Sequence, residues 1–138
     1  MECIDFLPST IDEISIITKE GGLLVGLCNN HNSNSILASR ILTDLRKISK
    51  EMSGGDLHSF SMFNKKFLSI PCIEDDVVIF VRCPLTIKEK KIIKMGKVIA
   101  KMFIDSTKDV DFRNWKENSS NFNDFKKNLE IYFKMSNL

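Results

Sequence analysis

The 138-residue chain is 43% hydrophobic and 28% charged, a balance that excludes a disordered protein and fits one soluble domain with its own core. The formal net charge of +2 is too small to indicate nucleic-acid binding by itself. No basic segment followed by an apolar one opens the sequence, and its apolar runs are too short to span a bilayer, so we expect a cytoplasmic protein.

Two aliphatic segments near the start of the chain, residues 14–18 and 23–27, predict a pair of β-strands. Gly21 and Gly22 lie between them and supply the positive φ values that a tight hairpin turn requires. With Gly26 they form G-G-x-x-x-G, which matches neither nucleotide-binding glycine motif, and a strand follows where a phosphate-binding loop needs a helix. We therefore interpret these glycines as a turn and expect no nucleotide cofactor.

The middle of the chain predicts one helix and three strands. Apolar residues recur every three or four positions over residues 36–52, which indicates an amphipathic helix ended by glycines. Residues 57–63, 67–73 and 77–83 are then predicted to be strands separated by polar turns. The last of the three begins with a continuous apolar run, which is typical of a strand buried on both faces. In the strand before it, Pro71 predicts a bulge or a sheet edge.

Two helices are predicted after the last strand. Thr86 and Glu89 have the spacing of a capping box, so the first helix is expected to open there and to run to about residue 105. A polar connector over residues 109–120 carries the single Trp, Trp115, and a final helix is expected from about residue 121. The apolar stripes of the two helices are Ile92, Met95, Ile99, Met102 and Phe103, and Phe122, Phe125, Leu129, Tyr132 and Phe133. The second stripe fits either a core-facing helix or a detachable amphipathic segment.

The element order is therefore ββαβββαα. Because five strands that can pair antiparallel cannot bury both faces by themselves, we expect one helix on one face and two on the other. This is an α+β fold, a three-layer α/β/α sandwich around a five-stranded antiparallel sheet. No repeat or low-complexity linker divides the chain, so we expect a single domain over residues 1–138 with its core at about residues 13–133.

This element order and several sequence details resemble the longin domain family. The matching features are I-x-I-I-T-K-E-G-G-L-L-V at residues 14–25, the helix that ends in S-G-G at residues 53–55, and the strand V-V-I-F-V-R-C-P at residues 77–84. The likeness extends over nearly the whole chain, is similar in style to archaeal longin-like proteins, and implies a longin/profilin-like fold. The related roadblock domain shares the sheet but usually opens with an additional helix, for which the dozen residues before the first strand leave little room.

Membership in this family would imply a non-catalytic module without a cofactor that forms homodimers or heterodimers with other longin or roadblock proteins. Such modules bind small Ras-like GTPases, SNAREs or other trafficking and motility components. The resemblance therefore implies an adaptor that dimerises and binds or regulates a small Ras-like GTPase, in vesicle trafficking or in signalling complexes.

Candidate catalytic and metal-ligating residues are few. Cys28 and His31 have a C-x-x-H spacing, but no second pair completes the four ligands of a structural zinc. His58 lies near two serines, without the sharp turn that presents a hydrolase nucleophile. The acidic residues 74–76 suit a hairpin turn without a cation. We therefore expect reduced cysteines, no metal, no cofactor and no enzymatic activity.

Two surfaces are candidates for partner binding. Residues 57–63 are rich in apolar side chains and would lie at an edge of the longin sheet, where a dimer partner would cover them. Residues 85–101 carry six lysines against one glutamate, which indicates a solvated helix face, an acidic protein partner or an anionic membrane surface. No arginines or aromatic residues interleave with these lysines, which argues against nucleic acid. The predicted partner-binding residues are Leu57, Phe60, Met62, Phe63, Arg40, Lys91 and Lys94.

Three classes of function remain. The leading hypothesis is the dimerising, GTPase-binding longin-like adaptor, with a roadblock-like dimeric scaffold as its variant. The second is a peripheral membrane-associated adaptor that uses the lysine-rich helix and the final amphipathic helix. The third is an enzyme or ligand sensor on the same scaffold, because a fold does not determine a function, and an enclosed polar pocket around His31 or His58 would indicate it.

Overall fold

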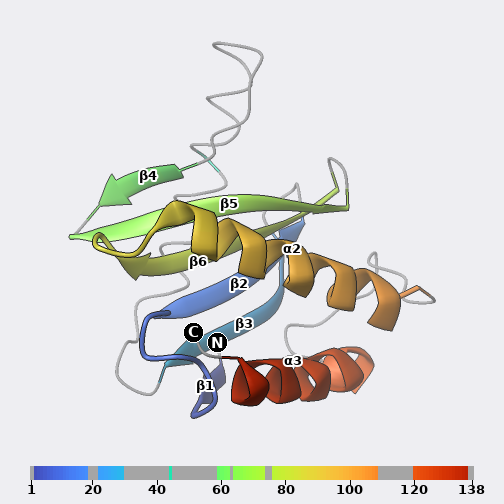
Figure 1. The fold of residues 1–138 in the computed structure, drawn as a ribbon. Helices are drawn as coiled ribbons and strands as arrows, with labels where there is room; N and C mark the ends of the chain where they lie inside the picture. Colours follow the sequence, from blue (N-terminus) through green and yellow to red (C-terminus); the bar gives the residue numbers. More distant parts are fainter. Residues whose placement is uncertain are drawn as a thin grey trace.

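The computed structural model describes residues 2–18, 22–29, 44, 59–62, 64–73, 76–108 and 120–136. They form an α+β fold in which two long helices pack on one face of a mixed six-stranded sheet (Figure 1). The strands are β1 Glu2–Ile4, β2 Glu13–Thr18, β3 Leu23–Asn29, β4 Ser59–Met62, β5 Lys65–Ile73 and β6 Val77–Pro84. The helical segments are α2 Glu89–Ser106, the short 3₁₀ turn η2 Ser120–Phe122 and α3 Asn123–Met135.

The strands are arranged in the order β1-β3-β2-β6-β5-β4, and every neighbouring pair except β1 with β3 is antiparallel. All five strands predicted from the sequence are present. The prediction of a five-stranded, purely antiparallel sheet is wrong, because β1 adds a sixth strand that pairs parallel to β3. β1 is only three residues long, so no alternation indicates it in the sequence. Its register, with Cys3 opposite Cys28, depends on a strand more than twenty residues away.

The glycine-containing turn joins β2 to β3 as predicted. The Thr18 N–H donates a hydrogen bond to the Gly22 carbonyl oxygen at 2.8 Å, and the Gly22 N–H donates one to Thr18 Oγ1 at 3.0 Å. These bonds close a hairpin around residues 19–21, which lie outside the described part of the chain. Because β3 follows the turn directly, the arrangement is that of a hairpin and not that of a phosphate-binding loop.

β6 lies in the interior of the sheet, between β2 and β5. Its residues 77–81 are all buried, as the continuous apolar pattern predicted. In β5 the register with β6 shifts between Pro71 and Ile73, which confirms the predicted irregularity at the proline. The centre of the sheet therefore follows the sequence pattern closely.

The N-terminus of α2 differs from the predicted capping box at Thr86. The helix begins at Glu89, and the preceding Lys88 is extended and makes no side-chain capping hydrogen bond. Residues 85–88 form a turn after β6. In this turn the Ile87 N–H donates to the Pro84 carbonyl oxygen at 3.3 Å, and Lys66 Nζ donates to the Ile87 carbonyl oxygen at 3.1 Å. Because these contacts belong to the turn, the helix begins later than predicted. The spacing of Thr86 and Glu89 could not indicate them, because Lys66 belongs to another strand.

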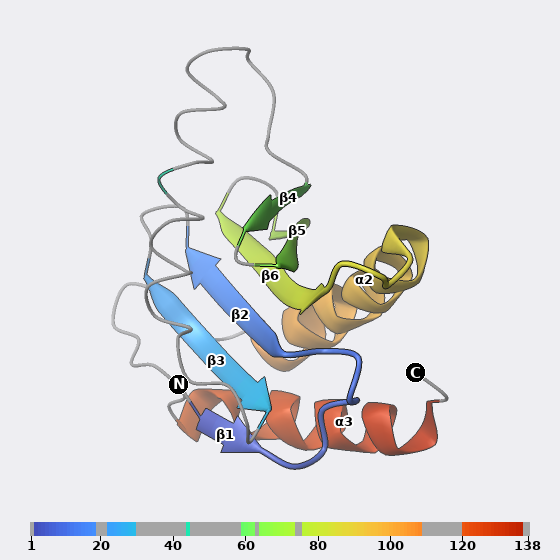
Figure 2. The same cartoon turned by 90° about the vertical axis from the view of Figure 1, so that its left-hand side faces the viewer.

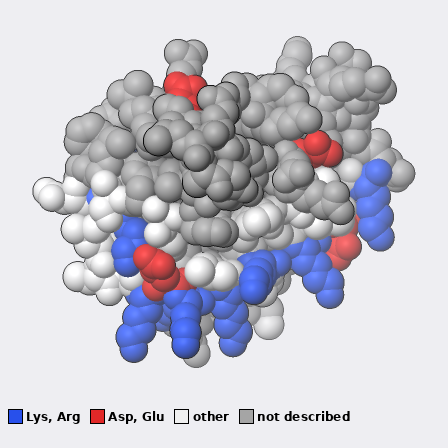
Figure 3. All heavy atoms as spheres, turned by 90° about the horizontal axis from the view of Figure 1, so that it is seen from above, with Lys and Arg blue, Asp and Glu red and all other residues white. Residues whose placement is uncertain are grey.

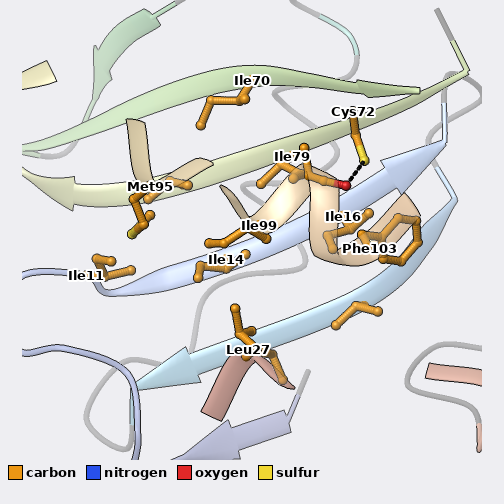
Figure 4. Close-up of a cluster of buried hydrophobic side chains, with 14 of the residues drawn as sticks. Ile11, Ile14, Ile16, Leu27, Ile70, Cys72, Ile79, Met95, Ile99 and Phe103 are labelled. Atoms are coloured by element: carbon orange, nitrogen blue, oxygen red, sulfur yellow. Dashed lines mark hydrogen bonds between the residues drawn. The ribbon is translucent and has the colours of Figure 1, made fainter. Parts of the chain in front are cut away.

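The main core lies between the sheet and the two helices. α2 crosses β5 and β6, and α3 lies beside α2, nearer β1 and β3 (Figure 2). Figure 4 shows Ile14, Ile16 and Ile79 of the sheet grouped with Ile99 and Phe103 of α2. In the same view the Cys72 thiol donates to the Ala100 carbonyl oxygen at 3.7 Å.

The aromatic stripe at the end of the chain faces this core. Phe103 of α2 stacks on Phe122 with ring centroids 5.8 Å apart and meets Phe125 edge-on at 5.2 Å. Leu129 is fully buried, and Phe133 stacks on Phe6 at 6.4 Å. Of the two interpretations of this helix, the core-facing one is therefore the arrangement observed.

The opposite face of the sheet carries a second, smaller cluster of buried apolar side chains, formed by Ile17, Phe67, Val78 and Phe80. The helix predicted over residues 36–52 lies outside the described residues except for Asp44, which is helical. The polar connector with Trp115 also lies outside them. The third layer of the sandwich therefore stays a prediction.

Candidate interaction surface

The structure places the predicted partner-binding residues in two separate regions. Phe60 and Met62 belong to β4, at one end of the sheet. Lys91 and Lys94 are exposed on α2. Outside the described residues lie Leu57, Phe63 and Arg40.

β4 is the end strand of the described sheet. It pairs antiparallel with β5 alone, with Phe60 opposite Phe67 and Ser61 opposite Lys66. In the turn between the two strands, Asn64 has a φ of 61°, in the left-handed region that Asn tolerates better than most residues. The outer side of β4 therefore presents main-chain groups at an edge, the position expected from the longin resemblance.

Two ion pairs fasten the beginning of β5, and with it the β4–β5 hairpin, to the rest of the fold. Lys65 Nζ lies 2.9 Å from Asp12 Oδ2, and Lys66 Nζ lies 3.8 Å from Glu89 Oε1. The first pair connects the hairpin to the segment before β2, and the second connects it to the start of α2. β4 thus pairs with a strand, β5, that two ion pairs hold to the rest of the fold.

α2 has one buried and one basic side. The buried residues are Ile92, Met95, Gly96, Ile99, Ala100 and Phe103. On the opposite side lie Lys90, Lys94, Lys97 and Lys101, which are spaced by three or four residues and are all exposed. In Figure 3 basic side chains project in a row from the side of the molecule on which α2 lies. Neither described helix is long and apolar enough to cross a membrane.

Exposed aliphatic side chains on the same helices were missed by the sequence predictions. In α2, Ile93 and Ile104 are 37% and 38% exposed, and in α3, Ile131 and Met135 are 49% and 81% exposed. Helical periodicity places Ile93 and Ile104 at the border between the lysine row and the buried stripe, beside Ala100. The sequence does not distinguish these isoleucines from core residues, because Ile93 and Ile104 stand in three-and-four spacing with the buried Gly96 and Ala100.

On the sheet face away from the helices, Glu13 and Arg82 form a buried ion pair between β2 and β6. The two residues are opposite each other in the ladder, and Arg82 Nη2 lies 3.4 Å from Glu13 Oε2. Ser15 Oγ donates a hydrogen bond to Glu13 Oε1 at 2.8 Å. Burial raises the pKa of the Glu13 carboxyl, against the smaller opposing effects of the Ser15 hydrogen bond and the Arg82 charge. The sequence could not indicate this pair, because it depends on the order of the strands.

The four cysteines are free thiols, of which one is exposed and three are buried. Cys3 is exposed on β1, and its Sγ lies 3.0 Å from that of the buried Cys28 on β3. Burial raises the pKa of Cys28 to about 11 and that of Cys72 to about 12. Burial also raises the pKa of Cys83. The buried thiols are therefore held in the protonated, unreactive form.

In the described ranges, no three His, Cys, Asp or Glu side chains are close enough to hold a metal ion. His31 and His58 lie outside these ranges, so the absence of a site at either histidine stays a prediction. An open depression of about 480 Å³ lies between residues 4–6 and α3. Two of the charged groups that line it, Lys134 Nζ and Glu130 Oε1, pair with each other at 2.9 Å.

Comparison with known proteins finds a similar solved structure but no protein that is related in sequence. No family model and no curated protein matches the chain. Among solved structures, the chain is similar to the Roadblock/LC7 domain from Streptomyces avermitilis, with 10% sequence identity, coverage of 70% of this chain and 83% of that chain, and a TM-score of 0.49. This level of likeness identifies no family, so the α+β assignment rests on the strand order and helix positions given above.

Proposed function

We propose that this chain is a non-catalytic, cytoplasmic interaction module that dimerises through β4 and binds a small Ras-like GTPase. The observation that carries the dimer is the position of β4 at the end of the sheet. The partner class comes from the longin resemblance of residues 14–25 and of the element order. A longin-like adaptor and a roadblock-like scaffold both fit this description.

The physical argument for the dimer concerns the outer edge of β4, which pairs with no other strand of the described sheet. Monomeric proteins usually protect an edge strand with charged residues, a proline or a covering segment. β4 consists of Ser-Phe-Ser-Met and carries no charge. Antiparallel pairing with β4 of a second copy would continue the sheet across both copies and satisfy the outer main-chain groups. At the other end of the sheet, β1 has only three residues and begins with Glu2, so it offers a poorer edge.

A charged substitution on β4 tests the dimer. Ser61 is exposed on β4, and in the variant Ser61→Lys two like charges would meet where two β4 strands pair. We expect the wild-type protein to have the mass of a dimer in light scattering, and we expect its dissociation constant to rise about tenfold in the variant. Asn128→Lys adds the same charge at an exposed position of α3 and should leave the dimer intact. A monomeric wild-type protein at every concentration would refute the dimer.

The GTPase proposal needs a separate measurement. Small Ras-like GTPases from the same genome are tested for binding to the purified protein in their GDP-bound and GTP-bound states. We expect at least one of them to bind, with a preference for one nucleotide state, and Lys91→Glu and Lys94→Glu then test whether α2 contributes. No binding in either state to any of these GTPases would refute this part of the proposal.

A further inference from the structure

The outward side of α2 combines positive charge with exposed aliphatic surface. We call it the basic-aliphatic face and define it by Lys90, Lys94, Lys97 and Lys101 with Ile93 and Ile104. With 3.6 residues per turn and a rise of 1.5 Å per residue, the four lysines follow one side of the helix over roughly 16 Å. The four lysines lie opposite the side of α2 that packs on the sheet, and Ile93 and Ile104, which are 37% and 38% exposed, lie at the border between the lysines and the buried side.

The four lysines lack acidic partners among the described residues. Lys65, Lys66 and Lys126 each form an ion pair with a described carboxylate, but no lysine of the basic-aliphatic face does so. Four cations in line that form no ion pair with a described carboxylate create a positive potential that attracts an anionic surface. The row of basic side chains in Figure 3 lies along this side of the molecule.

Among the residues that the structure describes, the exposed large hydrophobic side chains lie in one part of the protein. In the described ranges, every large hydrophobic residue that is clearly exposed belongs to α2, to the turn just before it, or to α3. α3 lies beside α2 on the same face of the sheet (Figures 1 and 2), and it adds Ile131 and the 81% exposed Met135. Single exposed apolar residues are ordinary, but among the described residues these gather on the two helices that cover one face of the sheet and on the turn before α2.

This combination favours a lipid surface over an acidic protein segment. Acidic side chains would pair with the lysines and leave Ile93 and Ile104 in water. An anionic bilayer offers phosphate groups to the ammonium groups and, just beneath them, an apolar boundary to the isoleucines. Lysine stems also lie readily along an apolar boundary while their ammonium groups stay among the headgroups.

We infer that the basic-aliphatic face docks peripherally on an anionic membrane, with α2 lying along the bilayer surface. This inference goes beyond the proposed function and does not depend on it. β4 is at the end of the sheet, and α2 lies over the face of the sheet, so the proposed dimer surface and the basic-aliphatic face can be occupied together. A GTPase bound at Lys94 would compete with the membrane for α2.

Cosedimentation with vesicles tests the inference directly. The wild-type protein is mixed at low salt with vesicles of two parts phosphatidylcholine to one part phosphatidylserine, and separately with vesicles of phosphatidylcholine alone. We expect binding to the vesicles that contain phosphatidylserine, little binding to the others, and a steady loss of binding as salt rises. No phosphatidylserine-dependent binding at low salt would overturn the inference.

Substitutions on the basic-aliphatic face test whether this face is the one that binds the vesicles. In Lys94→Gln/Lys97→Gln/Lys101→Gln we expect binding to weaken on the order of a hundredfold, since each lysine near an anionic surface contributes about fivefold. Replacement of the same three lysines by arginine keeps the charge and should preserve binding. Ile93→Gln/Ile104→Gln should weaken vesicle binding with all four lysines present. Circular dichroism verifies that each variant is folded, and unchanged binding of the folded glutamine variant would refute the assignment.

The alternative partner is tested with immobilised polyglutamate. A protein that binds polyglutamate but not the anionic vesicles would assign the face to an acidic protein and overturn the membrane inference. Binding to polyglutamate that the two isoleucine substitutions do not affect, together with vesicle binding that they do, would support it. Oligomeric mass is measured separately, so a monomer that still binds vesicles refutes the proposed dimer without affecting this inference.

Discussion

At the scale of single residues, the Glu13 carboxyl links the stability of the fold to pH. Burial raises its pKa above the ordinary value of 4.5. The folded protein therefore holds this proton more tightly than the unfolded chain does. The resulting contribution to stability is fully present below the unfolded pKa and is lost as the pH rises through the raised pKa of the folded state.

The substitution Glu13→Gln tests this linkage. The variant has no carboxyl to titrate, so the free energy of unfolding of the wild-type protein relative to that of the variant should fall as the pH rises above about 4.5. Urea unfolding at a series of pH values measures the difference. Ser15→Ala keeps the carboxyl and should keep the pH dependence. A difference that instead grows with pH would mean that the attraction of Arg82 outweighs the burial of Glu13.

At the scale of elements, the contact between α2 and β5 is closest at Gly96. A Cβ atom added there would meet Ile70, with Cδ1 as its nearest atom and Cγ1 at 2.9 Å. Glycine is thus required by packing, although it lowers helix propensity by about 1 kcal/mol relative to alanine. Glycine thus allows α2 to approach Ile70 more closely than a Cβ atom would without a shift of that side chain.

The substitution Gly96→Ala should therefore destabilise the protein despite the gain in helix propensity. Overpacking of a core contact costs about 1–3 kcal/mol, so we expect a net loss of roughly 1 kcal/mol in the free energy of urea unfolding. In an Ile70→Val background the Cδ1 atom is gone, and the same substitution should cost less. An equal or larger cost in that background would show that Ile70 is not the obstacle.

The regular elements could be predicted because their patterns are local. The three-and-four spacing of α2 and α3 and the apolar run of β6 are periodic in the sequence itself. β1 could not be predicted, because three residues show no period and their pairing depends on β3. The start of α2 was misplaced for the same reason, since Lys66 of another strand holds the turn before it.

At the scale of the whole molecule, α3 completes the core formed by earlier segments. Phe125 is fully buried against Phe103, whereas Ile131 on the same helix is 49% exposed. Phe125→Ala should lower the free energy of unfolding by about 3–5 kcal/mol, and Ile131→Ala should change it by less than about 0.5 kcal/mol. Thermal or urea unfolding measures both. Similar small effects of the two substitutions would indicate a helix that detaches from the core.

The candidate surfaces could be predicted only in part. The edge position of β4 and the exposure of Lys91 and Lys94 agree with the expectations from the sequence. The relation between Ile93 and the lysine row becomes clear only when the buried side of α2 is known, because an isoleucine in a helix is more often a core residue. Which surfaces share one side of the protein is a property of the strand order and not of any local pattern.

The stacking of Phe6 on Phe133 and the 3.2 Å ion pair between Glu2 and Lys126 join distant parts of the sequence. Such contacts form only after long loops close, which slows folding compared with a chain of local contacts. During synthesis, the apolar core residues that pack against α3, such as Phe103, cannot make these contacts until α3 has left the ribosome. The nascent chain therefore exposes an apolar surface that can aggregate until α3 has been synthesised. A chaperone would bind the chain at this surface in that interval.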